Sequence, residues 1–121
     1  MLDFTGWTCV NCRKMEANVW TDAEVLKRLR DEYVLISLYV DEREPLPAKD
    51  IYTNKDGREI NTVGKKWQEF ELNRYGRNAQ PYYVLIDHNG NPLITPVGFS
   101  SVDEYVKFLD AGLEEFKKRN K

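Results

Sequence analysis

The alternation of apolar and polar positions divides the chain into strand-like and helix-like segments. The run "YVLISLYV" at 33–40 is apolar almost throughout and rich in β-branched and aromatic residues, which predicts a central strand covered on both faces. Residues 1–4 resemble the end of another strand, which leads directly into a cysteine motif. The runs 82–87 and 92–97 flank Asn89-Gly90, and an Asn-Gly pair between strand-like runs predicts a hairpin.

Two helices are expected in the first third of the chain. One begins within the cysteine motif and continues to about Asn18. The other runs to about Arg30 and starts at Thr21-Asp22-Ala23-Glu24, a sequence with the form of a capping box. Its apolar face is predicted to comprise Val25, Leu26 and Leu29.

Two more helices are expected later. Residues 64–75 have helical spacing through Trp67, Phe70 and Leu72, and Gly76 is suited to the C-terminal cap. The last helix begins after a capping box at 101–104. Its predicted buried stripe comprises Val102, Tyr105, Val106, Leu109, Leu113 and Phe116.

Residues 41–62 follow no regular period. Pro45 and Pro47 interrupt them, and Asp56-Gly57 predicts a turn, so we expect an inserted loop with a small hairpin. The order of elements is β, α, β, loop, α, β, β, α. It predicts one α/β domain over residues 1–121, with a central mixed sheet flanked by helices.

Composition excludes several classes of protein. A chain of 121 residues with 41% hydrophobic residues has enough apolar surface for a core, unlike a disordered segment. The net charge of −2 does not favour a nucleic-acid surface. The longest apolar run is too short to span a bilayer, and residues 1–8 lack the features of a signal peptide. The sequence by itself therefore names no compartment.

Both cysteines of the chain, Cys9 and Cys12, lie in the motif "WTCVNCRKM". A zinc site is disfavoured because structural zinc takes four ligands, and beyond these thiols the chain offers one histidine, His88. A purely structural disulfide is disfavoured because so short a loop removes little entropy from the unfolded chain. Two unreactive thiols remain an alternative.

Redox chemistry accounts best for the spacing. A thiolate at the first turn of a helix is stabilised by free backbone amides and by the helix dipole. Cys9 is therefore the expected nucleophile, and Cys12, one turn later, is placed to attack a mixed disulfide.

The segment "DFTGWTCVNC" resembles the motif of the thioredoxin superfamily, in which a strand precedes Trp-x-Cys-x-x-Cys. The resemblance covers nearly the whole chain and implies the thioredoxin-like fold. It implies that Asp3 is a buried acid that relays protons beneath the disulfide. It also implies that Pro81, in "QPYYVL", follows a cis peptide bond and faces the cysteines.

A narrower resemblance is to the C-terminal thioredoxin-like domain of the DsbD family of thiol:disulfide interchange proteins. It is carried by Cys9-Val10-Asn11-Cys12-Arg13-Lys14-Met15-Glu16 together with Asp3. It implies that Glu16 acts with Asp3 to raise the pKa of the nucleophile. It further implies tethering to a membrane portion of a longer chain, at the periplasmic side of a bacterial inner membrane. Gln80 replaces the threonine usual before the proline.

Elementary electrostatics agrees with these roles. Two carboxylates near a cysteine disfavour its thiolate, and burial raises the pKa values of the acids themselves. Arg13, Lys14 and the acidic stretch 41–44 are expected to be solvated. Trp7, Gln80 and Tyr82 are the candidate substrate-binding residues, with Tyr82 and Tyr83 pointing to opposite faces of their strand.

The sequence thus predicts a thiol–disulfide oxidoreductase that acts as a disulfide reductase or electron relay. Its expected partners are protein thiols and disulfides and an upstream electron donor, with no metal and no organic cofactor. The alternatives are a self-standing thioredoxin-like oxidase or isomerase, a redox-inactive binding module, and a module that binds Cu(I) through the two thiolates.

Overall fold

A short central strand, β1 (Leu2–Thr5), organises the fold in a computed structural model that describes residues 1–120. It pairs in parallel with β2 (Ile36–Tyr39) and antiparallel with β5 (Tyr82–Val84), which gives the order β2-β1-β5. The expected mixed sheet is confirmed. All four residues of β1 are buried, because the strand has neighbours on both edges and helices on both faces.

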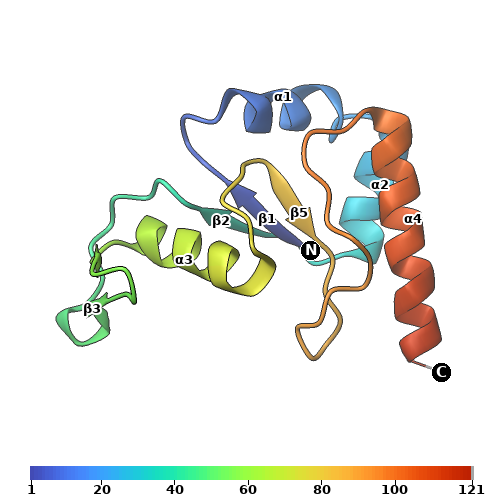
Figure 1. Ribbon diagram of the computed structural model, residues 1–121. Coiled ribbons are helices and arrows are strands. Elements are labelled where there is room, and N and C mark those ends of the chain that lie inside the picture. The colour runs from blue at the N-terminus through green and yellow to red at the C-terminus, as the bar shows by residue number, and fades with distance from the viewer. Residues whose placement is uncertain (121) are drawn as a thin grey trace.

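Helices cover the two faces of this sheet unequally. On one face lie α1 (Val10–Asn18), α2 (Ala23–Glu32) and α4 (Val102–Arg119), and on the other lies α3 (Val63–Tyr75), as Figure 1 shows. The capping box at Ser101 and Glu104 forms as expected at the start of α4.

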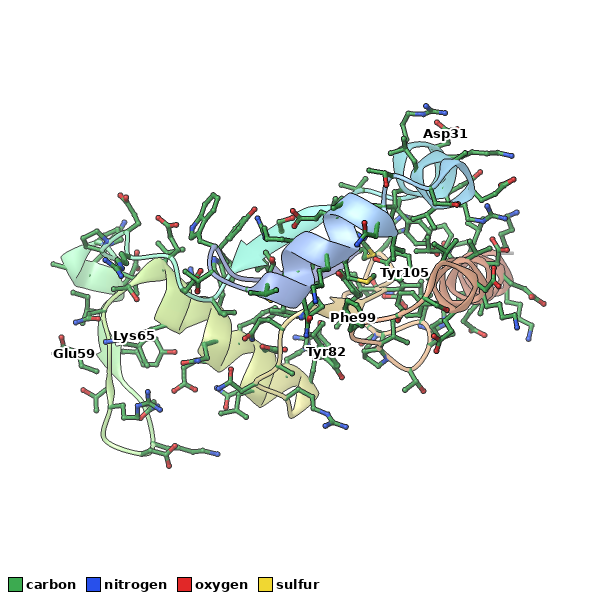
Figure 2. The ribbon with its side chains drawn as sticks, turned by 90° about the horizontal axis from the view of Figure 1, so that it is seen from above. Asp31, Glu59, Lys65, Tyr82, Phe99 and Tyr105 are labelled. Atoms are coloured by element: carbon green, nitrogen blue, oxygen red, sulfur yellow. A yellow bond between two sulfur atoms is a disulfide. The ribbon has the colours of Figure 1, made fainter. Side chains whose placement is uncertain are left out.

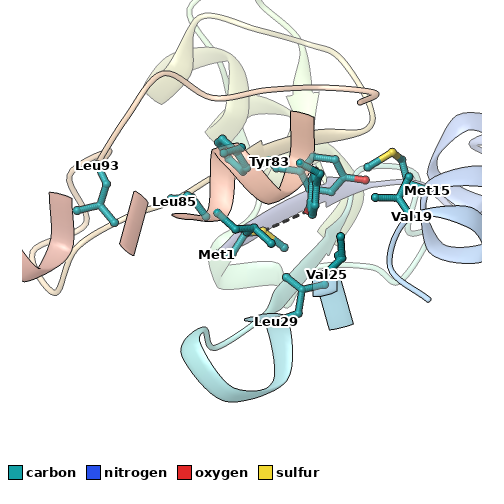
Figure 3. Packing of buried hydrophobic residues seen from close by; sticks show 11 residues of the cluster. Met1, Met15, Val19, Val25, Leu29, Tyr83, Leu85 and Leu93 are labelled. Atoms are coloured by element: carbon teal, nitrogen blue, oxygen red, sulfur yellow. Dashed lines mark hydrogen bonds between the residues drawn. The ribbon is translucent and has the colours of Figure 1, made fainter. Parts of the chain in front are cut away.

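The period of two along β1 separates the core into two clusters. Leu2 and Phe4 point toward α3 and pack with Leu38 and Val84. The larger cluster lies on the opposite face and joins residues of α1, α2, β5 and α4 around Tyr83 (Figure 3). Because Asp3 alternates with Leu2 and Phe4, it belongs to the face that α1 covers.

The prediction that 33–40 is a central strand was wrong. β2 lies at the edge of the three-stranded sheet, and Val34 and Ile36 are 76% and 47% exposed. Hydrophobic content alone cannot distinguish an edge strand from a central one, since strand order depends on pairing between distant segments. The central place belongs to β1, although only four residues of apolar character were expected to form a strand there.

The hairpin at Asn89-Gly90 is present, but 92–97 is not a continuous strand. Its backbone pairs with residues 82–87 only at two isolated β-bridges, which join Ile86 to Pro92 and Tyr83 to Val97. Pro92 and Pro96 have no backbone N–H to donate to a ladder, so regular pairing is interrupted.

Three details of the helices differ from expectation. Asp22, rather than Thr21, caps α2 by accepting from the amides of Glu24 and Val25. Leu26 and Leu72 are exposed, whereas Glu71 is completely buried on α3. Helical periodicity locates a buried face only to within one residue, and here α3 is rotated so that a carboxyl group enters the interior.

Residues 41–62 contain a 3-10 turn (Ala48–Asp50) and the expected small hairpin, formed by β3 (Tyr52–Thr53) and β4 (Glu59–Ile60). Within residues 1–120, no helix has both the length and the apolar character needed to cross a bilayer.

Candidate redox site

The two cysteines form a disulfide at the start of α1. Cys9 is the N-cap of the helix, and its Sγ accepts a hydrogen bond of 3.2 Å from the backbone amide of Cys12. Cys12 is 2% exposed, whereas Cys9 is partly exposed. The sulfur that an approaching partner can reach is therefore also the one that receives a helix N-terminal amide, as expected for a stabilised thiolate.

Asp3 lies in β1, which leads into this motif, and it is 2% exposed. Its carboxylate accepts a hydrogen bond of 2.9 Å from Ser37 Oγ on the neighbouring strand. Burial raises the pKa of Asp3 from 3.8 to about 6, against the opposing effect of the Ser37 hydrogen bond. The negative charge of Glu16 raises this pKa further, and the positive charge of Arg13 lowers it.

Arg13 is solvated only in part: its side chain is 39% exposed, and its guanidinium also binds the protein. Its Nη2 donates to Thr5 Oγ1 at 3.0 Å and to Gly6 O at 3.3 Å, and it forms an ion pair with Glu16 at 3.0 Å. The guanidinium therefore ties the first turns of α1 to the end of β1, and it partly neutralises Glu16.

The acidic stretch after β2 is solvated only in part, because Glu44 is exposed as expected whereas Asp41 and Glu42 are half-exposed and bind the loop before Cys9. Asp41 accepts hydrogen bonds from the backbone amides of Trp7 and Thr8, at 2.9 and 3.2 Å, and Glu42 accepts one of 2.7 Å from the indole N–H of Trp7. The Trp7 ring stacks on Tyr39 with centroids 4.0 Å apart. These contacts fix the loop that precedes Cys9, and they join segments more than 30 residues apart, which no local pattern reveals.

The Gln80–Pro81 peptide bond is cis, as expected. The register of β1 with β5 pairs Phe4 with Tyr82, so Pro81 lies beside Thr5, at the end of the sheet from which the cysteine loop departs. Tyr82 and Tyr83 belong to opposite clusters, as expected.

A further exposed aromatic residue, Phe99, borders the same end of the sheet. It lies between Gly98, which packs against the carbonyl of Pro81, and Ser100, whose amide contacts the sulfur of Met15 in α1. Phe99 is 58% exposed and lies near Tyr82 in Figure 2. An isolated Phe in a loop carries no sequence signal, so only the fold identifies it.

Glu71 is a second buried acid, bound to the loop that precedes Pro81, and no local sequence pattern indicates its burial. Its two carboxylate oxygens accept hydrogen bonds from Gln80 Nε2 at 3.0 Å and from the amide of Ala79 at 3.4 Å. Burial raises the pKa of Glu71 from 4.5 to about 7, and the two hydrogen bonds oppose this rise.

No group of three or more potential metal ligands occurs among residues 1–120. His88, expected in an exposed turn, is exposed and meets the ring of Phe116 edge-on. The site therefore combines a disulfide at a helix start, a buried acid on the strand that leads into it, and exposed aromatic rings, while a second buried acid holds the loop before Pro81.

The chain is similar to proteins with thioredoxin-like domains. The family model described as a thioredoxin-like domain matches residues 1–113. A thioredoxin from Thermus thermophilus has 20% identity and a TM-score of 0.64, over 99% of this chain and 77% of that one. A protein described as DsbH oxidoreductase has 23% identity and a TM-score of 0.61, over 93% of this chain and 70% of that one. No curated protein matches the sequence significantly.

Proposed function

Because this chain belongs to the family of thioredoxin-like domains, we propose that Cys9 and Cys12 are the reacting pair of a thiol–disulfide oxidoreductase. The observation that carries the proposal is their disulfide at the start of α1, with one sulfur accessible and the other buried. A bond that closes so short a loop adds little stability, so its formation and breakage serve chemistry better than folding.

The reaction balances with two electrons and no cofactor. The Cys9 thiolate attacks a partner disulfide, forms a mixed disulfide and releases the first partner thiolate. Cys12 then attacks the Cys9 sulfur and releases the second partner thiolate, so the partner gains the two electrons that the dithiol loses. Cys12 must give up a proton in this step, and Asp3, with a pKa of about 6, is the proposed acceptor.

The direction we propose is reduction of the partner. Oxidants of this class owe their strength to a stabilised reduced form, in which a thiolate is strongly favoured. Here we propose that the negative charges of Asp3 and Glu16 disfavour the thiolate, and the Arg13 cation on the same helix is already paired with Glu16. A weakly stabilised thiolate favours the disulfide form of the domain and therefore makes its dithiol a reductant.

The surface around Cys9 suits a protein partner. Trp7, Val10 and Phe99 are 57%, 66% and 58% exposed, and Gln80 and Tyr82 adjoin Pro81. Exposed aromatic and aliphatic groups around a reacting sulfur supply apolar contact area for a docking chain.

The resemblance to the DsbD family extends this proposal to cellular context. We propose that the domain works at the periplasmic side of a bacterial inner membrane, tethered to a membrane portion that supplies its electrons. The residues that support this are Asp3 and Glu16 with the Cys-Val-Asn-Cys motif.

Cysteine variants test the chemistry. Cys9→Ser is expected to abolish reduction of a protein disulfide, and Cys12→Ser to accumulate mixed disulfides with the partner, because the first attack then has no resolving thiol. Mass spectrometry under non-reducing conditions detects such adducts. Full turnover by either single variant would show that the two-cysteine mechanism is wrong.

The reduction potential tests the direction. Equilibration with glutathione is expected to give a value below about −230 mV, at or beyond the reducing end of the glutaredoxin range. A value near about −120 mV, typical of a strong oxidant such as DsbA, would contradict the reductase role and leave the dithiol chemistry intact.

A further inference from the structure

Glu71 occupies a position on α3 where an apolar side chain would add to the core. It is 0% exposed, and no ion pair within residues 1–120 involves it. Burial of a carboxyl group without a cation is unfavourable unless its oxygens receive hydrogen bonds. The groups that donate hydrogen bonds to Glu71 therefore indicate which part of the structure the buried carboxyl group holds in place.

Both donors belong to the loop that connects α3 to β5. Gln80 Nε2 binds one oxygen and the Ala79 amide binds the other. Residues 77–80 form no regular structure, and Gln68 on the same helix makes a further contact with Asn78, at 3.2 Å. Since the loop has no ladder of its own, side chains of α3 determine its conformation.

We propose that Glu71 is a positioning residue of the redox site, which holds residues 77–80 so that the partly exposed Gln80 and Tyr82, on either side of the buried Pro81, present a fixed docking edge to the partner's disulfide. This inference rests on the proposed thiol–disulfide exchange. The Gln80 side chain is long enough for its amide to reach Glu71 on α3. The threonine that is usual at this position in the family that the chain resembles is shorter. The pair Glu71–Gln80 is therefore a feature of this chain's own residues.

The loop is tied to the site by contacts on its other side. Pro81 follows it directly and lies beside Thr5, to which Arg13 of α1 donates. A displacement of residues 77–80 would therefore move Pro81 and Tyr82, which follow directly in the chain, more than it would move the two sulfur atoms. Loss of the Glu71 contacts should therefore affect partner docking and leave the dithiol unchanged.

The test compares the parent protein with Glu71→Gln in two reactions. One is reduction of insulin, a protein disulfide, with dithiothreitol as the electron source, and the other is exchange with oxidised glutathione, which makes few contacts beyond the sulfurs. In Glu71→Gln both loop hydrogen bonds lose the negative charge that strengthens them, and Gln80 must turn its amide over to meet the new N–H₂ group. We expect the KM for insulin to rise about tenfold, which corresponds to about 1.4 kcal/mol, with the glutathione exchange rate and the reduction potential unchanged.

Glu114→Gln is the matched control, because it removes the same charge from an exposed position on α4. It is expected to behave as the parent in both reactions. An insulin KM in Glu71→Gln within about twofold of this control would overturn the proposal, since a factor of two is below the effect of one hydrogen bond. Equal losses with insulin and glutathione would also overturn it, by placing the effect on the dithiol or on the fold as a whole.

A second variant covers the case in which Glu71→Gln folds poorly. The exchange Glu71→Gln with Gln80→Glu restores an acceptor opposite each donor. It is expected to recover the KM for insulin and the protection of the Ala79 amide from hydrogen exchange. A double variant no better than the single one would contradict the proposal.

Failure of the proposed function gives a different pattern. A parent protein that reduces neither insulin nor glutathione contradicts the oxidoreductase assignment. Exchange of the Ala79 amide then still decides the role of Glu71, because faster exchange in Glu71→Gln supports positioning of the loop and unchanged exchange excludes it.

Discussion

At the scale of single residues, the charges near Cys9 oppose one another. The Cys12 amide donates to Cys9 and favours its thiolate, whereas the role proposed for Asp3 and Glu16 is to disfavour it. Arg13 is bound to Glu16 and to the end of β1, so its charge is shared with the acid. Since these groups have opposite effects on the Cys9 thiolate, the influence of the acids is measured by removing their negative charges.

Neutralising the two acids is expected to lower the pKa of the Cys9 thiol in the reduced protein. Asp3→Asn with Glu16→Gln removes both negative charges and leaves the Arg13 cation without its partner, so the thiolate forms at lower pH. Ultraviolet absorbance of the thiolate measures this titration. The reduction potential should rise in parallel, by about 30 mV for each tenfold shift in the equilibrium with glutathione.

The matched control for this experiment is Glu114→Gln, far along α4 from the cysteine loop. A thiol titration in the double variant that coincides with the parent and control curves would show that the acids do not influence the sulfur. A shift toward higher pH would reverse the sign of the argument.

At the scale of elements, the start of α3 lies unusually close to the segment after β2. A Cβ added at Gly64 would stand 2.6 Å from the carbonyl oxygen of Val40 and equally close to the backbone N and O of Glu42. These are backbone atoms, which cannot rotate away as a side chain would. This close approach places Glu42, and with it the hydrogen bond to Trp7, beside the cysteine loop.

Gly64→Ala is therefore expected to destabilise the protein, although alanine favours helices more than glycine does. The overlap should lower the free energy of unfolding by about 1–3 kcal/mol, the usual effect of overpacking. Denaturant midpoints measure it, with Asn73→Ala on the exposed face of α3 as the control. An increase in stability would show that the backbone after β2 moves away at little cost.

At the scale of the whole molecule, two buried acids influence how stability depends on pH. Burial raises the pKa of Asp3 from 3.8 to about 6 and that of Glu71 from 4.5 to about 7. Between the ordinary and the raised value of each group, the folded protein binds more protons than the unfolded chain. The free energy of unfolding therefore decreases as pH rises through these windows, by at most about 1.4 kcal/mol per group and pH unit.

Urea unfolding of the oxidised protein at about pH 5, 6 and 7 is expected to show this decrease. Asp3→Asn should flatten the curve below about pH 6, and Glu71→Gln should flatten it up to about pH 7. Asp41 and Asp87 have lowered pKa values, so their stabilising effect is lost only at more acidic pH. Burial lowers the pKa of the Met1 amine, which acts in the opposite sense, so each variant is compared with the parent. A parent stability that rises from pH 5 to 7, with variants parallel to it, contradicts the assignment.

The sequence by itself determined most of the element types and identified the cysteine pair that forms the disulfide. Local patterns were enough for this: two cysteines at helical spacing, Asn89-Gly90 between apolar runs, Ser101 with Glu104, and Gly76 at a helix end. Each of these is a property of neighbouring residues, so it needs no knowledge of distant contacts. The expected cis bond before Pro81 came from the resemblance to a family rather than from any local rule.

The tertiary structure alone decided which strand is central, which helix face is buried and which charged residues reach the site. The central strand proved to be β1, α3 turned Glu71 inward, and Asp41 bound the loop before Cys9. Each of these depends on segments that lie close together in space and far apart in the chain. The local sequence around a hydrophobic or charged residue is the same whether or not a distant segment contacts it. Only the pairing of strands and the packing of helices bring that distant segment into contact.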